Sequence, residues 1–171
     1  MRRLFIMDQK DYDNSWNRYK RPSVRGIIIK NNKVAMVYSR KFDYYKFPGG
    51  GIENGEDHIT TLKRELTEET GLTISENTIT EYGSALRIQK SRFVENEIFE
   101  QENFYYLCDT VSDAGKQSLD EYEADEGFEL QFVEPEYAIS VNRTHDHSDY
   151  DVHLIERESR VLESLVKDGL L

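Results

Sequence analysis

The stretch FPGGGIENGEDHITTLKRELTEETGL, residues 47–72, contains a strand end, a glycine loop and a helix in direct succession. Pro48 lacks a backbone N–H and favours extended backbone at Phe47, so a strand should end here. The three glycines that follow allow backbone angles closed to other residues and leave no side chain in the way of a ligand. We therefore predict a strand, a loop that can approach a bound group, and then a helix.

The helix in this stretch has its own start and stop signals. Asp57 can cap the first turn with its carboxylate, and Gly71 can take the left-handed backbone that ends many helices. Between them, Ile59, Leu62 and Leu66 recur at helical spacing and form an apolar stripe that can face a core. The sequence thus predicts a helix between Asp57 and Gly71.

Three glutamates crowd one flank of this helix. Glu65, Glu68 and Glu69 stand at positions i, i+3 and i+4, so their charges repel one another. Arg64 can pair with Glu68 one turn on but cannot neutralise all three. From the sequence alone, a neutral replacement such as Glu69→Gln should relieve repulsion, so the metal-free protein should be at least as stable as before.

A divalent cation would cancel the excess charge. Clustered carboxylate oxygens suit Mg²⁺, with Mn²⁺ as the alternative, and such a cation can polarise a phosphoryl oxygen and lower the pKa of a bound water. The competing interpretation is a solvated acidic helix face, which is the usual meaning of an isolated group of glutamates. The wider spacing pattern decides between them.

The wider pattern runs over 23 residues and specifies nine of them. It consists of Gly50, five residues, Glu56, seven residues, Arg64-Glu65-Leu66, one residue, Glu68-Glu69, one residue and Gly71-Leu72. At every specified position this resembles the Nudix box of the Nudix, or MutT-like, hydrolases. The resemblance implies a strand–loop–helix catalytic element that cleaves nucleoside diphosphates linked to another group.

The resemblance also implies roles for individual residues. It makes Glu65, Glu68 and Glu69 metal ligands, and Glu65 is the candidate for activating the attacking water. Arg64 would orient the glutamates, and Glu56 would be a supporting carboxylate near the loop. The catalytic residues implied in this way are Glu65, Glu68, Arg64 and Glu56.

Residues outside the pattern complete the predicted site. The acidic segment 120–129 precedes a predicted strand, and in many Nudix enzymes a glutamate on a loop at such a position completes the metal site. Glu123 is the first choice for this ligand and Glu126 the second, against the alternative of a solvated acidic loop. For Tyr45 and Arg87, core packing and a solvated strand edge are the alternatives to substrate contact. The predicted substrate-binding residues are Gly49, Gly50, Gly51, Tyr45 and Arg87.

Composition limits the other functions open to this chain. Its 171 residues are a length typical of one domain, and we expect a single domain over residues 1–171. The net charge of −11 argues against nucleic-acid and membrane partners. One cysteine, Cys108, excludes an internal disulfide, and no apolar run reaches membrane-spanning length. We expect a cytoplasmic protein that acts on a small nucleotide, with a homodimer left open.

The remaining segments alternate between strand and helix patterns. Residues 1–21 are expected to form an N-terminal arm or edge strand, and the Asn31-Asn32 pair predicts a hairpin turn. Loops are expected over 112–118 and 142–150; the histidines of the second fit no structural zinc spacing. Strands are expected over 24–29, 34–38, 42–47, 79–93, 98–108 and 128–133, and helices from Pro135 and over 151–168.

These elements predict fold class α/β (α+β), a mixed β-sheet sandwiched between α-helices, as the Nudix resemblance also implies. The leading hypothesis is a metal-dependent pyrophosphohydrolase, in which water attacks a phosphorus of a diphosphate bridge. The alternative is a Nudix-fold nucleotide-binding or sensing module without hydrolase activity, which has no need of a full glutamate cluster. Nucleoside triphosphates, including oxidised ones, and nucleotide sugars both stay open as substrates.

Overall fold

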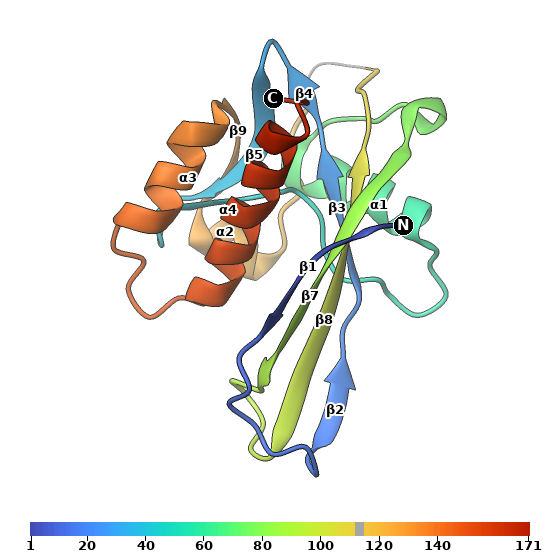
Figure 1. Ribbon diagram of the computed structural model, residues 1–171. Coiled ribbons are helices and arrows are strands. Elements are labelled where there is room, and N and C mark those ends of the chain that lie inside the picture. The colour runs from blue at the N-terminus through green and yellow to red at the C-terminus, as the bar shows by residue number, and fades with distance from the viewer. Residues whose placement is uncertain (112–114) are drawn as a thin grey trace.

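The computed structural model describes residues 1–111 and 115–171. Two β-sheets form its centre (Figure 1). The larger sheet has the order β1-β7-β8-β2, with β3 also paired to β8. Its strands are β1 (Arg3–Asp8), β2 (Asn17–Lys20), β3 (Ser23–Ile27), β7 (Thr80–Lys90) and β8 (Glu97–Leu107). The smaller sheet consists of β4 (Ile29–Lys30), β5 (Lys33–Ser39), β6 (Tyr44–Lys46) and β9 (Phe128–Val133).

Both sheet directions occur, as the predicted mixed sheet requires. β1 runs parallel to β7, and β2 and β3 run parallel to successive parts of β8, whereas β7 and β8 are antiparallel. In the smaller sheet, β5 pairs antiparallel with β4, β6 and β9. The central strand β5 therefore connects the strand that precedes the glycine loop, β6, to the strand that follows the acidic segment, β9.

Helices cover the two sides of these sheets. Leu62 and Leu66 of α1 pack with Val24 of β3 in one buried cluster, and Val141 and Leu162 of α3 and α4 belong to another. Figure 1 shows α3 and α4 together on one side and α1 on the other. The predicted sandwich of helices around a mixed sheet is thus confirmed. The helices are α1 (His58–Thr70), α2 (Glu121–Glu126), α3 (Pro135–Thr144) and α4 (Val152–Lys167), with a 3₁₀ turn, η1 (Glu76–Thr78).

Local signals place the boundaries near the site as predicted. The Asp57 carboxylate accepts a hydrogen bond from Thr60 N at 2.7 Å and caps α1, and Gly71 ends it with φ +69°. Asn31 and Asn32 both have positive φ, 52° and 58°, which suits the tight turn between β4 and β5. At the other end of the chain, the Asp151 carboxylate accepts hydrogen bonds from His153 N and Leu154 N and caps α4.

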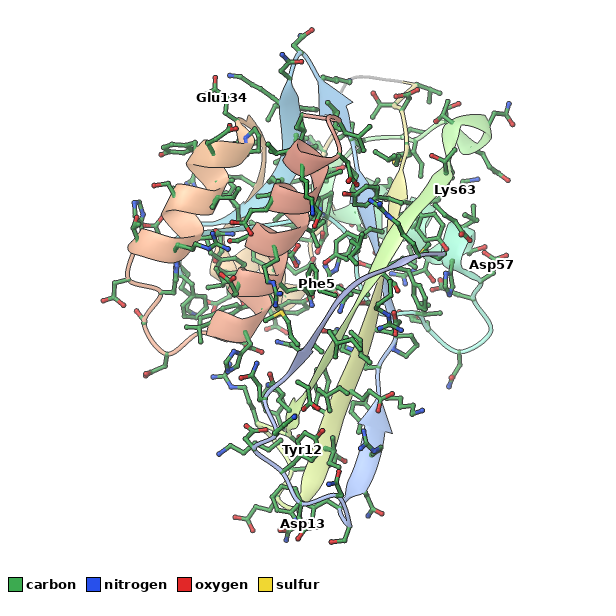
Figure 2. All side chains as sticks on the ribbon, in the orientation of Figure 1. Phe5, Tyr12, Asp13, Asp57, Lys63 and Glu134 are labelled. Carbon is green, nitrogen blue, oxygen red and sulfur yellow. The ribbon has the colours of Figure 1, made fainter. Side chains whose placement is uncertain are left out.

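Two segments differ from the expectation. The acidic segment 120–129 contains the helix α2 instead of a loop, and α3 continues to Thr144 into the expected loop 142–150. Residues 1–21 contain β1 and β2, the first and last strands in the order of the larger sheet, which is the edge-strand alternative considered for them. Tyr12 and Asp13, in the segment between β1 and β2, lie at one tip of the larger sheet (Figure 2). Part of the loop expected over 112–118 lies outside the described residues.

No helix in the described ranges has the length and apolarity that a bilayer crossing needs.

Candidate active site

The glycine loop lies directly against β3. Gly26 N donates to Pro48 O at 2.9 Å, and Val24 N donates to Gly50 O at 3.0 Å. Gly49 has φ +133°, and a Cβ added there would lie 2.2 Å from Val24 O. Glycine is therefore required at position 49, both for its backbone angle and because no side chain fits between loop and strand.

The next glycine makes room for the first glutamate of α1. A Cβ added at Gly50 would lie 2.3 Å from Glu65 Oε2, so this carboxylate lies directly on the loop backbone. Burial raises the pKa of Glu65, against the opposing charges of Arg64, Arg25 and Lys46. A carboxylate with a raised pKa is better suited to accept a proton than an ordinary surface glutamate.

Arg64 orders the carboxylates on the outer flank of α1. Its Nε and Nη2 donate to the two oxygens of Glu56, both at 2.9 Å. Its Nη1 donates to Glu65 at 2.9 Å and to Glu68 at 3.1 Å. The contact with Arg64, with further help from Thr61, lowers the pKa of Glu56 to about 2. This pattern fits the predicted orienting role of Arg64 and the supporting role of Glu56.

Glu69 turns inward, unlike its neighbour. Its side chain is 1% exposed, whereas that of Glu68 is 41% exposed. Glu69 Oε1 accepts from Lys46 Nζ at 2.6 Å, and Oε2 accepts from Gly49 N at 2.8 Å. Glu69 therefore ties α1 to both the end of β6 and the glycine loop.

Glu123 also lies inside, on the short helix α2. The residue is 4% exposed, its Oε2 accepts from Asp120 N at 3.0 Å, and its Oε1 accepts from Tyr122 OH at 2.9 Å. Burial, followed by the negative charge of Glu69, raises the pKa of Glu123. The structure therefore brings Glu123 near enough to Glu69 for their charges to interact.

Glu126, the second choice, lies on the same helix but has other partners. Its Oε2 accepts from Ser39 Oγ and from Tyr44 OH, both at 3.3 Å. Burial raises its pKa, and the charge of Lys46 opposes that rise. These contacts tie Glu126 to strands β5 and β6.

Tyr45 and Arg87 lie in the interior. Tyr45 is 4% exposed, and its hydroxyl donates to Gln131 Oε1 at 2.8 Å. Arg87 is 4% exposed, and its guanidinium binds Asp151 at 2.6 Å and Gln101 at 3.2 Å. Because Arg87 is buried, the solvated strand edge considered for it is wrong. The predicted substrate contacts of both residues stay predictions.

The donor set around the loop fits a hard divalent cation. Within residues 1–111 and 115–171, no three acidic, histidine or cysteine side chains stand close enough together to enclose a metal ion. Glu65 and Glu69 nevertheless offer carboxylate oxygens beside the loop, and Glu123 offers another near Glu69. Carboxylate oxygen is the ligand type that Mg²⁺ and Mn²⁺ prefer. A positive charge already stands against this set, since the ammonium of Lys46 contacts Glu69. Lys46 thus supplies a positive charge to the buried carboxylate of Glu69.

Two basic residues near the loop were missed from the sequence. Lys46 is one, and its signal is a lone lysine inside the aromatic strand FDYYKF. Arg21 is the other: a Cβ added at Gly51 would lie 3.2 Å from its Nε. Arg21 is exposed, so its guanidinium can contact a group bound at the loop. Arg21 reaches the loop because the following strand β3 pairs with it, and Lys46, which precedes the loop in sequence, reaches Glu69 because α1 packs there. Local sequence patterns do not report such long-range contacts.

Residues 20–154 of the chain match the NUDIX domain. The match covers most of the chain and includes the glycine loop, α1 and α2. The chain therefore belongs to the NUDIX family, which confirms the family resemblance found in residues 50–72.

Curated relatives match parts of the chain. An 8-oxo-dGTP diphosphatase from Buchnera aphidicola subsp. Schizaphis graminum is 47% identical over 55 residues, which are 30% of this chain and 42% of that protein. An RNA pyrophosphohydrolase from Haemophilus ducreyi is 33% identical over 109 residues, which are 58% of this chain and 54% of that protein. The matched regions thus span about half the length of these relatives.

Solved structures share the fold. A NUDIX hydrolase from Nitrosomonas europaea has a TM-score of 0.57 and 18% identity, with 81% of this chain and 87% of that chain covered. A structure from a study of MutT from Aliivibrio salmonicida and Vibrio cholerae has a TM-score of 0.54 and 18% identity, with 88% and 99% covered. At these identities the likeness shows the fold, and it agrees with the predicted fold class.

Proposed function

We propose that this chain is a divalent-metal-dependent pyrophosphohydrolase that cleaves a phosphoric anhydride bond of a nucleotide. The observation that carries the proposal is the contact of Glu65 with the backbone of Gly50, with Glu69 and Glu123 close by. This arrangement combines a proton acceptor, a loop without side chains and oxygen donors for a cation. The names of the two relatives, a diphosphatase and a pyrophosphohydrolase, agree with that chemistry.

Glu65 is the proposed general base. Arg64 holds its Oε1, which leaves Oε2 beside the loop to take the proton of the attacking water. The water oxygen then bonds to phosphorus, and the bridging P–O bond breaks with its electrons on the departing phosphate. A divalent cation bound by Glu65, Glu69 and Glu123 would stabilise the charge that builds on the phosphate oxygens.

The proposed substrate is a nucleoside triphosphate or a nucleotide sugar. Arg21, exposed beside Gly51, is the proposed contact for a phosphate of the substrate. The net charge of −11 disfavours a long polyanion such as RNA, because the phosphate backbone would be repelled outside the site. The name of one relative, an RNA pyrophosphohydrolase, nevertheless makes an RNA with a 5′-triphosphate a necessary comparison.

The experiment that tests the proposal is a substrate panel with Mg²⁺. It contains the common nucleoside triphosphates, 8-oxo-dGTP, nucleotide sugars and a 5′-triphosphate RNA, and it measures phosphate and pyrophosphate release with identification of the nucleotide product. Turnover of a mononucleotide that is at least tenfold faster than that of the RNA would support the proposal. Nucleotide binding without any turnover would instead support the sensing module considered from the sequence.

Removal of divalent metal is expected to abolish turnover. Exhaustive EDTA treatment should remove activity, and Mg²⁺ or Mn²⁺ should restore it without any need for zinc, since the donor atoms are oxygens. Because the cation binds the folded state, Mg²⁺ at about 100 times its Kd should stabilise the protein by about 2.7 kcal/mol, measured as a higher Tm. Activity that survives EDTA, or returns with zinc alone, would contradict the proposed metal site.

Glu123→Gln is expected to lower kcat much more than it raises KM. The neutral amide keeps the shape of the side chain but removes a charge proposed to hold the cation that stabilises the transition state, and loss of such a contact lowers kcat more than it raises KM. We expect a loss in kcat of roughly 10–100-fold. Steady-state kinetics at several Mg²⁺ concentrations would measure it.

Two variants on the same helix serve as controls for Glu123. Glu121 is exposed on α2, so Glu121→Gln should leave kcat within about twofold of the wild type. Glu126→Gln should have a smaller effect than Glu123→Gln, because Glu126 is bound to Ser39 and Tyr44. Should Glu123→Gln match the wild type while Glu126→Gln loses activity, the choice of the outer carboxylate is wrong.

A further inference from the structure

Lys46 is a lysine that the fold keeps away from solvent. It is 7% exposed and stands in β6 between Tyr45 and Phe47, both of which are buried. Its ammonium lies 2.6 Å from Glu69 Oε1 and 4.2 Å from the centre of the Phe128 ring. Removing an ammonium from water is costly, so the ion pair and the ring face compensate for the lost hydration.

The position of this ammonium is central to the acidic site. Its charge acts on Glu65 and on Glu123, as well as on its direct partner Glu69. Arg25 also acts on Glu65, but its guanidinium is engaged by the backbone oxygens of Phe47 and Gly49. Arg64 is committed to the outer flank of α1 through its two bonds to Glu56. Lys46 is therefore the counter-charge on the inner side of the cluster, where the carboxylates of α1 and α2 approach each other.

Each oxygen of the Glu69 carboxylate already accepts one hydrogen bond. Oε1 is engaged by the Lys46 ammonium and Oε2 by Gly49 N. A Mg²⁺ ion binds oxygen at about 2.1 Å and would repel an ammonium that holds the same oxygen. The lysine stem has four flexible carbons, so the ammonium can leave Glu69 without any change in the backbone.

We propose that Lys46 is a built-in competitor of the metal ion, which holds Glu69 in the metal-free protein and must release it before that carboxylate can bind a cation. This inference rests on the metal site of the proposed function. It assigns Lys46 a role as a positioning residue that sets the metal affinity. The metal-free fold gains a satisfied buried carboxylate, and the site binds a free cation less tightly than its carboxylates alone would.

The test compares the wild type with Lys46→Met, which keeps an unbranched apolar stem and removes the charge. Isothermal titration of the metal-free proteins with Mn²⁺ and with Mg²⁺ should show a Kd about tenfold or more lower for Lys46→Met, the size of an ordinary coupling between two ligands. The Tm of metal-free Lys46→Met should fall, because Glu69 loses its partner, and added Mn²⁺ should raise it by more than in the wild type.

The matched control is Lys63→Met. Lys63 stands on the exposed face of α1, where it binds Glu76 at 2.9 Å, near Asp57 at the outer edge of the molecule (Figure 2). The Lys63→Met substitution removes one positive charge from α1 without changing any contact of Glu65, Glu69 or Glu123. The Kd of this variant for Mn²⁺ and Mg²⁺ should therefore stay within about twofold of the wild-type value. A similar gain in both variants would mean a general charge effect and would overturn the inference.

A measurement on the wild type keeps the test independent of how the variant folds. Lysine ammonium groups in ¹⁵N-labelled protein can be followed by NMR during a Mg²⁺ titration, with the Lys46 signal assigned by its loss in Lys46→Met or Lys46→Arg. The Lys46 signal should shift in a one-to-one titration while that of Lys63 stays. If the wild type binds metal but the Lys46 signal does not move, or if wild type and Lys46→Met have equal Kd values, the inference about Lys46 is overturned and the proposed metal site stands. If the wild type binds neither metal, the metal site of the proposed function fails.

Discussion

Glu69→Gln is expected to lower kcat by about 100-fold or more at saturating Mg²⁺, the size of effect seen when a charge that stabilises a transition state is lost. The buried carboxylate of Glu69 hydrogen-bonds the glycine loop from α1, accepting from Gly49 N at 2.8 Å. The amide has the same shape but is a poor ligand for a hard cation. Steady-state kinetics of the wild type and the variant on the best substrate of the panel would measure the loss.

The same change is also expected to destabilise the metal-free protein by roughly 1–3 kcal/mol. It leaves the buried ammonium of Lys46, 2.6 Å from Glu69 Oε1, without a charged partner. This reverses the sign expected from the sequence, where loss of one charge among three glutamates should relieve repulsion. Urea unfolding of the two metal-free proteins would decide the sign.

The control for both measurements is Glu76→Gln. Glu76 is an exposed carboxylate in η1 that binds Lys63 at 2.9 Å, so its loss should change neither kcat nor stability by much. An active Glu69→Gln protein at saturating Mg²⁺ would rule out the assignment of Glu69 as a metal ligand. A variant of unchanged stability would instead argue against the Lys46–Glu69 ion pair.

Gly49→Ala is expected to destabilise the protein by about 3 kcal/mol or more, from backbone strain and overpacking together. The backbone at this position has φ +133°, which side chains other than hydrogen rarely allow, and the added Cβ would lie 2.2 Å from Val24 O. A backbone carbonyl cannot turn away as a side chain can, so the loop would have to leave β3. Movement of the loop should also lower kcat, because Glu65 and Glu69 both contact it.

Gly51→Ala is the matched control in the same loop. A Cβ at Gly51 would meet the far end of the Arg21 side chain at 3.2 Å, and that flexible group can shift. The free energy of unfolding of Gly51→Ala should therefore stay within about 0.5 kcal/mol of the wild-type value. Thermal or urea unfolding of the three proteins would compare them. Equal stability of Gly49→Ala and the wild type would mean that the loop does not lie on β3 as described.

Some features of the fold and site were determined by the sequence alone. The cap at Asp57, the stop at Gly71 and the apolar stripe of Leu62 and Leu66 all act within a few residues of one another, so α1 could be predicted nearly to its ends. The turn at Asn31-Asn32 is equally local. The glutamate spacing around Arg64 is a helical pattern as well, and together with Gly50, Glu56 and Gly71-Leu72 it was enough to indicate the family.

The tertiary structure decided which groups these residues meet. Lys46 pairs with Glu69 across 23 positions, and Gly49 lies on Val24 of another strand, because sheet pairing and the packing of α1 bring these segments together. It also placed Glu123 inside the acidic cluster by forming α2, where the sequence indicated a loop. The charge repulsion among the glutamates of α1 could be predicted from their spacing in the sequence, because the helix period determines which side chains share a flank. The compensating charge comes from a strand, and the local periodicity of a sequence does not report which side chain the fold will bring there.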